Sequence, residues 1–166
     1  MIGNFGAASK LFLVAENIQP SAVWLYVNRS AYYSLLKEYD RALELTDKAI
    51  EADNRCPIAY SNKAAVQLSL GMFDSAVKNA SLALSLCKFY DMHARQCALA
   101  NRAEAFVGLD KIEEAKQDVA ALFRLNKKAF SGFVVLGKID IKSGDSHKAI
   151  ENFNQALAFA EAINKP

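Results

Sequence analysis

Four alanines recur at nearly constant spacing along this chain of 166 residues. They are separated by 34, 39 and 34 residues and occupy the same place in a helical pattern: Ala42, Ala76, Ala115 and Ala149. A fixed period in this range is typical of one supersecondary unit stacked on copies of itself. Such an array presents a long surface built from repeated positions, so the period bears on function as well as on fold.

Each unit has the pattern of two antiparallel helices. When the recurring alanine is set at position 20, small residues also occupy position 8 and, except for Leu122, position 27, and large ones mostly occupy positions 4, 11, 17 and 24. Small residues let two helices approach closely, and large residues fill the space around them. Gly71 and Gly144 mark two of the turns between helices, where the other two units have Lys37 and Asp110. We expect the second helices to be capped by Asp40, Asp74, Asp110 and Ser146.

This pattern resembles the tetratricopeptide repeat, a helix–turn–helix unit of 34 residues. The resemblance implies an all-α fold, a right-handed superhelical array of antiparallel helix pairs that forms a single domain over residues 1–166. The expected repeats are 23–56, 57–95, 96–129 and 130–166. Five extra residues in 57–95 lengthen either the last turn of one helix or the helix that follows it, and the last repeat ends in a lengthened helix.

The chain also opens inside a repeat according to this register. Ala8, Phe12, Ala15 and Pro20 fall where a second helix would carry them, so residues 1–22 are expected to form the second helix of a partial repeat. The two ends therefore resemble cut surfaces, because solenoids of this kind need polar outer faces at their ends.

Composition excludes several classes of function. The 20 basic and 18 acidic residues give a net charge of +2 with no basic stripe, which argues against a nucleic-acid partner. No apolar run reaches the ~18 residues of a membrane span, and the first residues lack the basic start of a signal peptide, so no membrane insertion is expected. Three cysteines without framework spacing, Cys56, Cys87 and Cys97, indicate a reducing compartment, which we take as the cytoplasm.

Asparagine recurs at position 6 of three first helices, as Asn28, Asn62 and Asn101. Asparagine is a mediocre helix former, so its recurrence calls for an explanation. In the resembled family the first helices line a concave surface, and some members hold a bound peptide by its main chain with a ladder of asparagines. An amide both donates and accepts hydrogen bonds, which suits that task. The alternative is that asparagine is a common choice at this position and faces an empty groove.

Three amides alone give too little affinity for a peptide. Each hydrogen bond contributes about 0.5–1.5 kcal/mol net, and micromolar binding needs about 8 kcal/mol. Other positions expected to face the concave surface would supply the rest, and they are mainly apolar: Trp24, Val27, Ile58, Leu68 and Val134, with Glu104 and Lys138. They indicate an extended, largely neutral or apolar peptide.

Two other functions of such chains are not favoured. Family members that dock the acidic tail of a chaperone carry a lysine at position 5, where this chain has Val27, Ser61 and Ala100, so an acidic tail would lack a cation opposite it. His93 and Cys97 stand four residues apart, but they lack the further ligands of a zinc site and a group to orient the histidine as a base. No cofactor, metal or catalytic activity is expected.

The sequence therefore predicts a protein–protein interaction module, an adaptor or scaffold whose partner is a protein or peptide. One alternative is a regulatory or targeting domain of a larger multidomain protein such as an enzyme. Another is an assembly module that self-associates through its chain ends.

Overall fold

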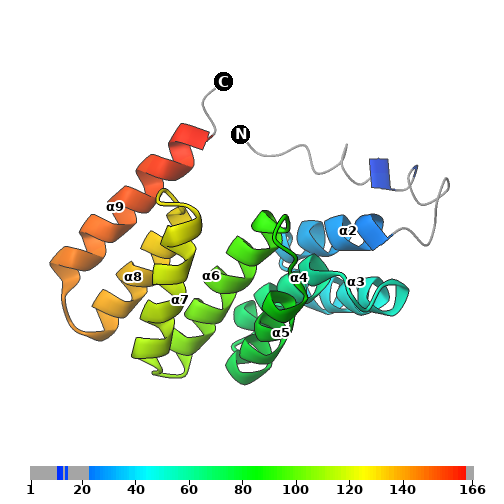
Figure 1. Cartoon of the computed structure of the whole chain (residues 1–166), viewed down its shortest axis with the longest axis horizontal. Coiled ribbons are helices and arrows are strands. Elements are labelled where there is room, and N and C mark those ends of the chain that lie inside the picture. The colour runs from blue at the N-terminus through cyan, green and yellow to red at the C-terminus, as the bar shows by residue number, and fades with distance from the viewer. Residues whose placement is uncertain (1–10, 13, 15–22, 164–166) are drawn as a thin grey trace.

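The computed structural model describes residues 11, 12, 14 and 23–163 (Figure 1). Eight helices follow one another over 23–163: α2 (Val23–Leu35), α3 (Tyr39–Ala52), α4 (Pro57–Ser69), α5 (Phe73–Leu86), α6 (Met92–Gly108), α7 (Ile112–Leu125), α8 (Phe130–Lys142) and α9 (Ser146–Ile163). Each odd-numbered helix packs on the even-numbered one before it, so the expected all-α superhelical array of antiparallel pairs is confirmed. The partial repeat expected in residues 1–22 lies outside the described residues except for Leu11, Phe12 and Val14.

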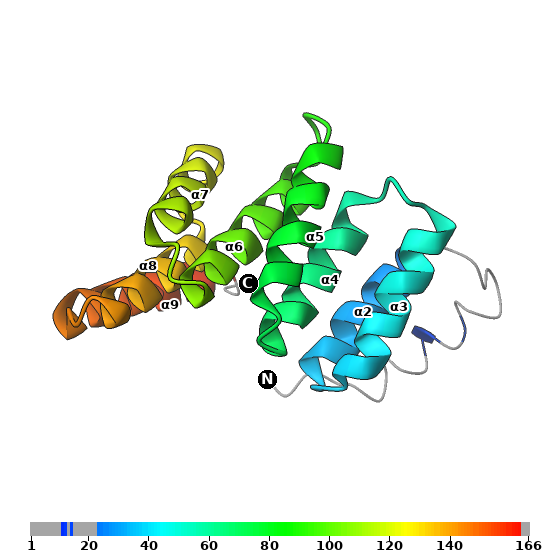
Figure 2. The same cartoon turned by 90° about the horizontal axis from the view of Figure 1, so that it is seen from below.

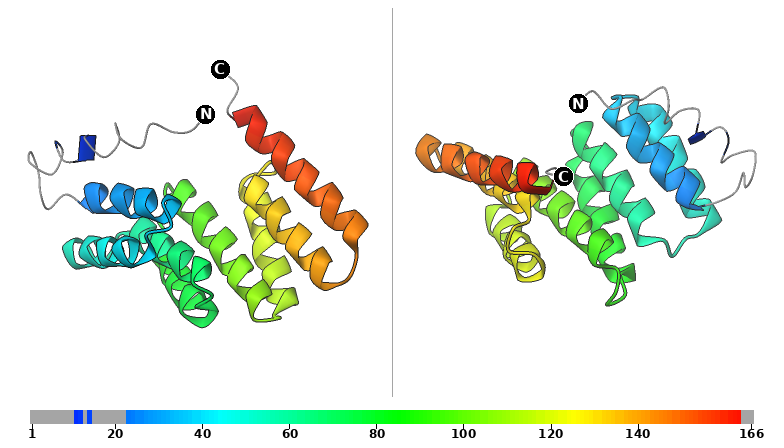
Figure 3. Two further views of the ribbon diagram at one scale, coloured as in Figure 1. Left: turned by 180° about the vertical axis from the view of Figure 1, so that it is seen from behind. Right: turned by 90° about the horizontal axis from the view of Figure 1, so that it is seen from above.

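The pairs form a curved row, as Figures 2 and 3 show. The first helices of successive pairs touch one another, because α2 contacts α4, α4 contacts α6 and α6 contacts α8. Within 23–163, the backbones of α3 and α5, and of α5 and α7, stay apart, and each of these second helices packs on the first helix of the next pair. A row in which neighbouring first helices lie closer together than neighbouring second helices bends toward its first helices. The first helices α2, α4, α6 and α8 therefore form the concave face.

The same turn joins the first helix to the second helix in all four pairs. Lys37, Gly71, Asp110 and Gly144 each have a positive φ, of 61°, 72°, 60° and 79°. In every case this residue donates its N–H to the carbonyl three residues back, and the next residue donates to the carbonyl five residues back. These are the paired bonds of a Schellman motif, which ends a helix on a left-handed residue. Two of the turns therefore hold a non-glycine residue in a conformation that glycine adopts at lower cost.

Small residues at positions 8, 20 and 27 form the seams between paired helices. They are buried throughout the array: Ser30, Ala42, Ala49, Ala64, Ala76, Ala83, Ala103, Ala115, Gly137, Ala149 and Ala156. Aromatic rings close over some of these seams, and a Cβ atom placed on Gly137 would lie 2.6 Å from Cε1 of Phe153. The close helix approach expected from the repeat pattern is thus achieved by backbone and small side chains, with rings packed against them.

The expected helix caps are wrong. Asp40 and Asp74 lie inside the first turns of α3 and α5, whose cap residues make no side-chain cap bond. Asp110 is the left-handed residue of its turn, and α9 is capped by Asp145, which accepts the N–H of Lys148 at 3.1 Å. The Schellman turns place the helix start one or two residues before the expected aspartates. There the carboxylates of Asp40 and Asp74 interact favourably with the positive end of the helix dipole but do not cap the helix.

The additional residues of the second expected repeat lie mainly in α6. This helix has 17 residues, whereas α2, α4 and α8 have 13 each. The connection before it, residues 87–91, is also one residue longer than those before α4 and α8. One extra helical turn of α6 therefore projects beyond the starts of its neighbours α4 and α8.

Candidate functional site

The concave face holds two cavities that adjoin each other, and we call them together the groove. The first lies between α2 and α4, has a volume of about 260 Å³ and is lined by Ser30, Ala31, Ser34, Leu35, Asn62, Ala65 and Val66. The second lies among α4, α6 and α8, has a volume of about 380 Å³ and is lined by Ser61, Asn62, Ala65, His93, Gln96, Cys97, Ala100, Asn101, Asn126, Ala129, Phe130 and Ser131. Asn62 and Ala65 belong to both. The groove thus runs across four successive first helices.

The asparagines of the predicted ladder have defined hydrogen bonds. Nδ2 of Asn62 donates to the main-chain oxygen of Val27 at 3.0 Å and to Oγ of Ser30 at 3.1 Å. Nδ2 of Asn101 donates to the main-chain oxygen of Ser61 at 2.9 Å and to Oγ of the same serine at 3.3 Å. Each amide therefore joins a first helix to the first helix of the preceding pair. This use of the amide N–H groups within the array was not foreseen from the sequence.

The structure separates the third asparagine from the other two. Asn28 is exposed on α2 and lines neither groove cavity, and Trp24, one turn earlier, is exposed in the same way. Asn62 and Asn101 share the wall of the second cavity. Within the described part of the chain, their side-chain oxygens accept no hydrogen bond.

Four apolar residues expected in the groove line neither of its two cavities. Val27 is buried in a cluster with Ala49 and Ala59, and Ile58 packs against that cluster. Leu68 packs on a buried alanine cluster formed by α4, α5 and α6. Val134 is partly buried on α8 and lines neither groove cavity. Val27, Ile58 and Leu68 thus serve helix packing, and the apolar lining of the groove comes from other residues.

The two charged residues of the predicted site neutralise each other. Lys138 on α8 donates a hydrogen bond to the carboxylate of Glu104 on α6. Two further cations next to the ladder are also paired: Lys63 with Asp47, and Arg102 with Asp118 in a two-pronged contact of 2.8 and 2.7 Å. Neither groove cavity has a lysine, arginine, aspartate or glutamate in its lining.

Several groove residues were missed by the sequence-based prediction. Exposed Leu35 lies at the α2 end and exposed Phe130 at the α8 end, while Ala65 forms the floor between the two cavities. Leu35 and Ala65 occupy groove positions of the resembled family, and their exposure was the missing information. His93 and Gln96 lie in the part of α6 that the period did not place.

Nothing in the groove is arranged as a nucleophile or a metal site. Sγ of Cys97 lies 3.7 Å from Nε2 of His93, but burial raises the pKa of the Cys97 thiol, which keeps it protonated at neutral pH. Burial likewise raises the pKa of Cys56 and Cys87, and all three thiols are free. Among the described residues, no group of three histidine, cysteine, aspartate or glutamate side chains is placed to hold a metal ion. No helix in that part of the chain combines the length and apolarity needed to cross a bilayer.

Known proteins resemble this chain over part of their length. The human mitochondrial import receptor subunit TOM70 is 29% identical over 102 residues, which is 61% of this chain and 17% of the receptor. The rat RNA polymerase II-associated protein 3 is 31% identical over 103 residues, or 62% of this chain and 15% of that protein. The chain thus spans less than a fifth of either relative.

A solved structure and a family match agree with this similarity. The structure of the first TPR of Spaghetti (RPAP3), bound to the HSP90 peptide SRMEEVD, superposes with a TM-score of 0.60 at 25% identity, covering 82% of this chain and 93% of that one. Residues 131–162, which hold most of α8 and of α9, match the tetratricopeptide repeat. Arrays of this repeat are protein-interaction modules. Residues 131–162 thus match a tetratricopeptide repeat, and the three helix pairs before them have the same architecture and the same turn.

Proposed function

We propose that the chain is an adaptor module that binds an extended, largely neutral or apolar peptide segment of a partner protein in the groove. The observation that carries this proposal is the lining of the two groove cavities, which meet at Asn62 and Ala65 and contain no charged residue among those described. A cavity wall without charges cannot compensate a charged ligand for the loss of its water. The main-chain amides and apolar side chains of a neutral peptide lose less on entering such a cavity.

The hydrogen bonds of Asn62 and Asn101 favour such a ligand. Their N–H groups are held by Val27 and Ser61, so the amide planes are fixed before a ligand arrives. Each side-chain oxygen can then accept an N–H of a bound main chain at little cost in side-chain entropy. Two such hydrogen bonds contribute only a few kcal/mol, which is too little for useful affinity. Apolar contacts with Leu35, Ala65 and Phe130 along the groove would supply the rest.

An acidic peptide such as the one bound to Spaghetti fits this groove less well. The cations nearest the ladder, Lys63, Arg102 and Lys138, are each committed to a carboxylate of the chain itself. A carboxylate in the groove would therefore lose water without gaining a free cation. We propose that the chain binds SRMEEVD more weakly than it binds a neutral segment.

A peptide library displayed on phage, selected on the full chain, tests the proposal. We expect the selected peptides to be neutral and rich in apolar residues over the bound segment, with affinities above that for SRMEEVD in a fluorescence anisotropy assay. Ala65→Arg should weaken binding of the selected peptides by about tenfold or more, because it fills the floor shared by both cavities. Ala120→Arg, at an exposed alanine on α7, is the matched control and should leave affinity unchanged. Equal affinities for the two variants, or preference for SRMEEVD, would contradict the proposal.

We propose self-association through α9 as a second candidate function, because this helix repeats an interface used inside the array. Ile50 and Leu84, on α3 and α5, pack against the first helix of the next pair, and Phe123 on α7 packs on Phe133 of α8. Leu157 occupies the equivalent place on α9 and is 58% exposed, with Ile150 beside it at 61%. A helix of a second copy would cover this face.

Sedimentation of the full chain distinguishes this candidate. A concentration-dependent dimer that is lost in Leu157→Glu, but kept in the exposed control Asn154→Glu, would support it. A monomer at all concentrations would exclude it and leave peptide binding untouched. A role inside a larger multidomain protein, and location in a reducing compartment where the three thiols stay free, remain parts of the proposal.

A further inference from the structure

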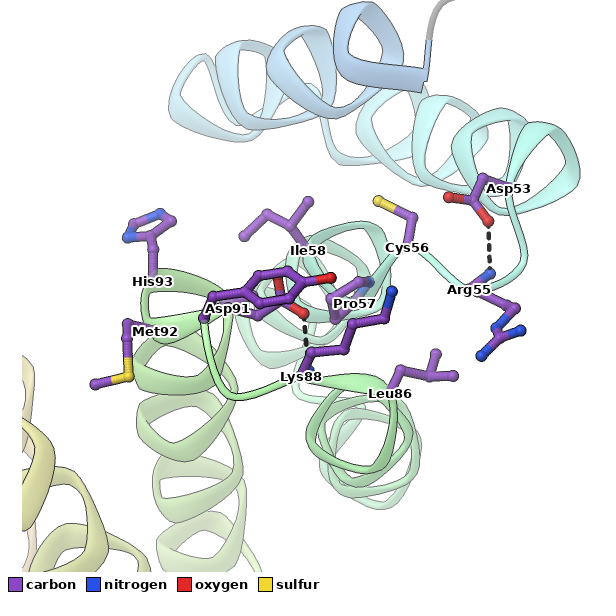
Figure 4. Close-up of a pocket in the computed structure, with 12 residues that line it drawn as sticks. Asp53, Arg55, Cys56, Pro57, Ile58, Leu86, Lys88, Asp91, Met92 and His93 are labelled. Carbon is purple, nitrogen blue, oxygen red and sulfur yellow. Dashed lines mark hydrogen bonds between the residues drawn. The ribbon is translucent and has the colours of Figure 1, made fainter.

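A third cavity lies at the edge of the concave face, and we call it the rim cavity. It has a volume of about 490 Å³ and is lined by residues from 53–58 and 86–94, which are the connection before α4 with the start of α4, and the connection before α6 with the first turn of α6 (Figure 4). The lengthened part of α6 forms one of its walls. The residues that interrupt the regular period therefore form one side of the rim cavity, and residues 53–58 form the other.

The rim cavity is continuous with the groove through one side chain. His93 lines both the rim cavity and the second groove cavity. It lies on the first turn of α6, beside Cys97 on the groove side. A peptide that leaves the groove between α4 and α6 passes over His93 into the rim cavity.

The carboxylates of the rim cavity have hydrogen-bond partners, whereas its cations have no ion-pair partner among the described residues. The carboxylate of Asp53 accepts the main-chain N–H of Arg55 at 2.9 Å, and that of Asp91 accepts the main-chain N–H of Lys88 at 2.8 Å, both drawn in Figure 4. The ammonium group of Lys88 lies 5.6 Å from the centre of the Tyr90 ring and reaches toward the start of α4. Among the described residues, neither Lys88 nor Arg55 forms an ion pair.

Apolar surface accompanies these cations. Ile58, Leu86 and Tyr90 line the same cavity, and Tyr90 is 59% exposed. Its ring packs edge-to-face on that of Phe89, at 5.1 Å between centroids, and Phe89 is the most exposed large apolar side chain described, at 84%. Two adjacent exposed rings beside unpaired cations suit a side chain with an apolar stem and an anionic end.

We infer that the rim cavity binds an aspartate or glutamate side chain that flanks the neutral segment lying in the groove. The carboxylate meets Lys88 and Arg55, and the methylene groups of the flank lie against Ile58 and Tyr90. This rests on the proposed function, because the groove holds the rest of the peptide. The predicted ligand is thus a neutral stretch followed or preceded by an acidic residue, and that residue fixes the direction in which the peptide lies in the groove.

A reversal of the two cations tests this inference. Phage selection on the full chain should enrich aspartate or glutamate at one fixed distance from the neutral segment. The double variant R55E/K88E should instead enrich lysine or arginine at that distance. The double variant K127E/K128E is the matched control, since it makes the same change of charge at two exposed lysines of the connection before α8 and should select the wild-type pattern. With one selected peptide, Lys88→Gln and Arg55→Gln should each weaken binding about threefold, the range of an exposed ion pair.

The outcomes separate this inference from the proposed function. If R55E/K88E selects the same peptides as the wild type, the rim cavity does not read charge and the inference is overturned. If Ala65→Arg still abolishes binding of those peptides, the groove function survives that failure. Loss of the Ala65→Arg effect overturns both. Thermal unfolding of each variant shows whether it retains the fold.

Discussion

The ring of Phe153 on α9 covers Gly137 on α8 so closely that no side chain fits between them. A methyl group on Gly137 would lie 2.6 Å from Cε1 and 2.8 Å from Cζ of the ring, well inside van der Waals contact. The pair links positions 8 and 24 of the last repeat, and Phe73 covers Gly108 in the same manner. Ring against backbone is thus a recurrent way in which this array closes its helices.

Gly137→Ala should lower the free energy of unfolding by about 1 kcal/mol. Overpacking a closed site costs about 1–3 kcal/mol, and the better helix propensity of alanine returns about 1 kcal/mol of it. Urea unfolding measures the change. Adding Phe153→Leu should remove most of the loss caused by Gly137→Ala, because the smaller side chain can move away. If the two changes add without interaction, the contact is not the cause.

Lys37→Gly should stabilise the protein by about 0.5–1 kcal/mol. Lys37 holds a φ of 61°, which costs a lysine about 1–2 kcal/mol that a glycine avoids, less the entropy glycine gains when unfolded. Asp110→Gly should gain less, since aspartate tolerates this conformation better and Asp110 also pairs with Lys142. Chemical denaturation of both variants gives the comparison, with Gly71→Ala as the opposite change. A loss of stability in Lys37→Gly would show that the turn does not store this strain.

Asn101→Ala should destabilise the free protein by about 1 kcal/mol, whether or not a ligand exists. The change removes the hydrogen bonds from Nδ2 to the oxygen atoms of Ser61, which join α6 to α4. Asn28→Ala is the matched control, because Asn28 is exposed and should change stability by less than about 0.5 kcal/mol. Equal effects in urea unfolding would mean that the bond between helices contributes nothing. Binding assays on Asn101→Ala must therefore be read together with its stability, which makes Ala65→Arg the cleaner test of the groove.

The free energy of unfolding should fall in alkaline solution partly because of Cys97. Burial raises the pKa of this thiol in the folded protein, so the folded state keeps the proton at pH values where the unfolded state has lost it. The resulting stability is complete below the unfolded thiol pKa of about 8.5 and is lost as pH rises through the higher folded value. Cys97→Ala should therefore show a smaller fall in unfolding free energy between about pH 8 and about pH 10. Identical falls in the two proteins would exclude a contribution from this thiol.

The fold was predictable because its signal is repeated. The register is fixed by Ala42, Ala76 and Ala115 together, so an atypical residue at one position does not change it. The helix pairs follow because small residues must face one another where two helices approach closely. The groove was less predictable. A position in a helix indicates a face, but burial also depends on how far each pair is rotated from the last. Val27 and Leu68 were therefore expected in the groove, whereas the curvature of the array places them in its packed seams.

Hydrogen bonds were harder still to foresee. The recurrence of Asn62 and Asn101 is visible in the sequence, but the partners of their amide N–H groups lie 32–40 residues earlier and depend on the spacing between first helices. The repeat period also predicts no structure for residues 87–95, because an inserted stretch has no equivalent positions in the other repeats. The rim cavity arises there, so the least regular part of the sequence holds the most distinctive part of the surface.

The one-sided contacts of the array have a mechanical consequence. Neighbouring first helices approach one another closely, whereas α3, α5 and α7 approach only the first helices on either side of them among the described residues. Because neighbouring second helices are joined only through the first helix between them, bending of the row changes the spacing of the first helices and their contacts with the second helices. Pulling the two ends apart would spread the first helices and loosen Asn62 and Asn101 from the helices before them. Tension between the two ends would thus change the width of the groove, and the peptide that we propose to lie across four first helices would resist that change.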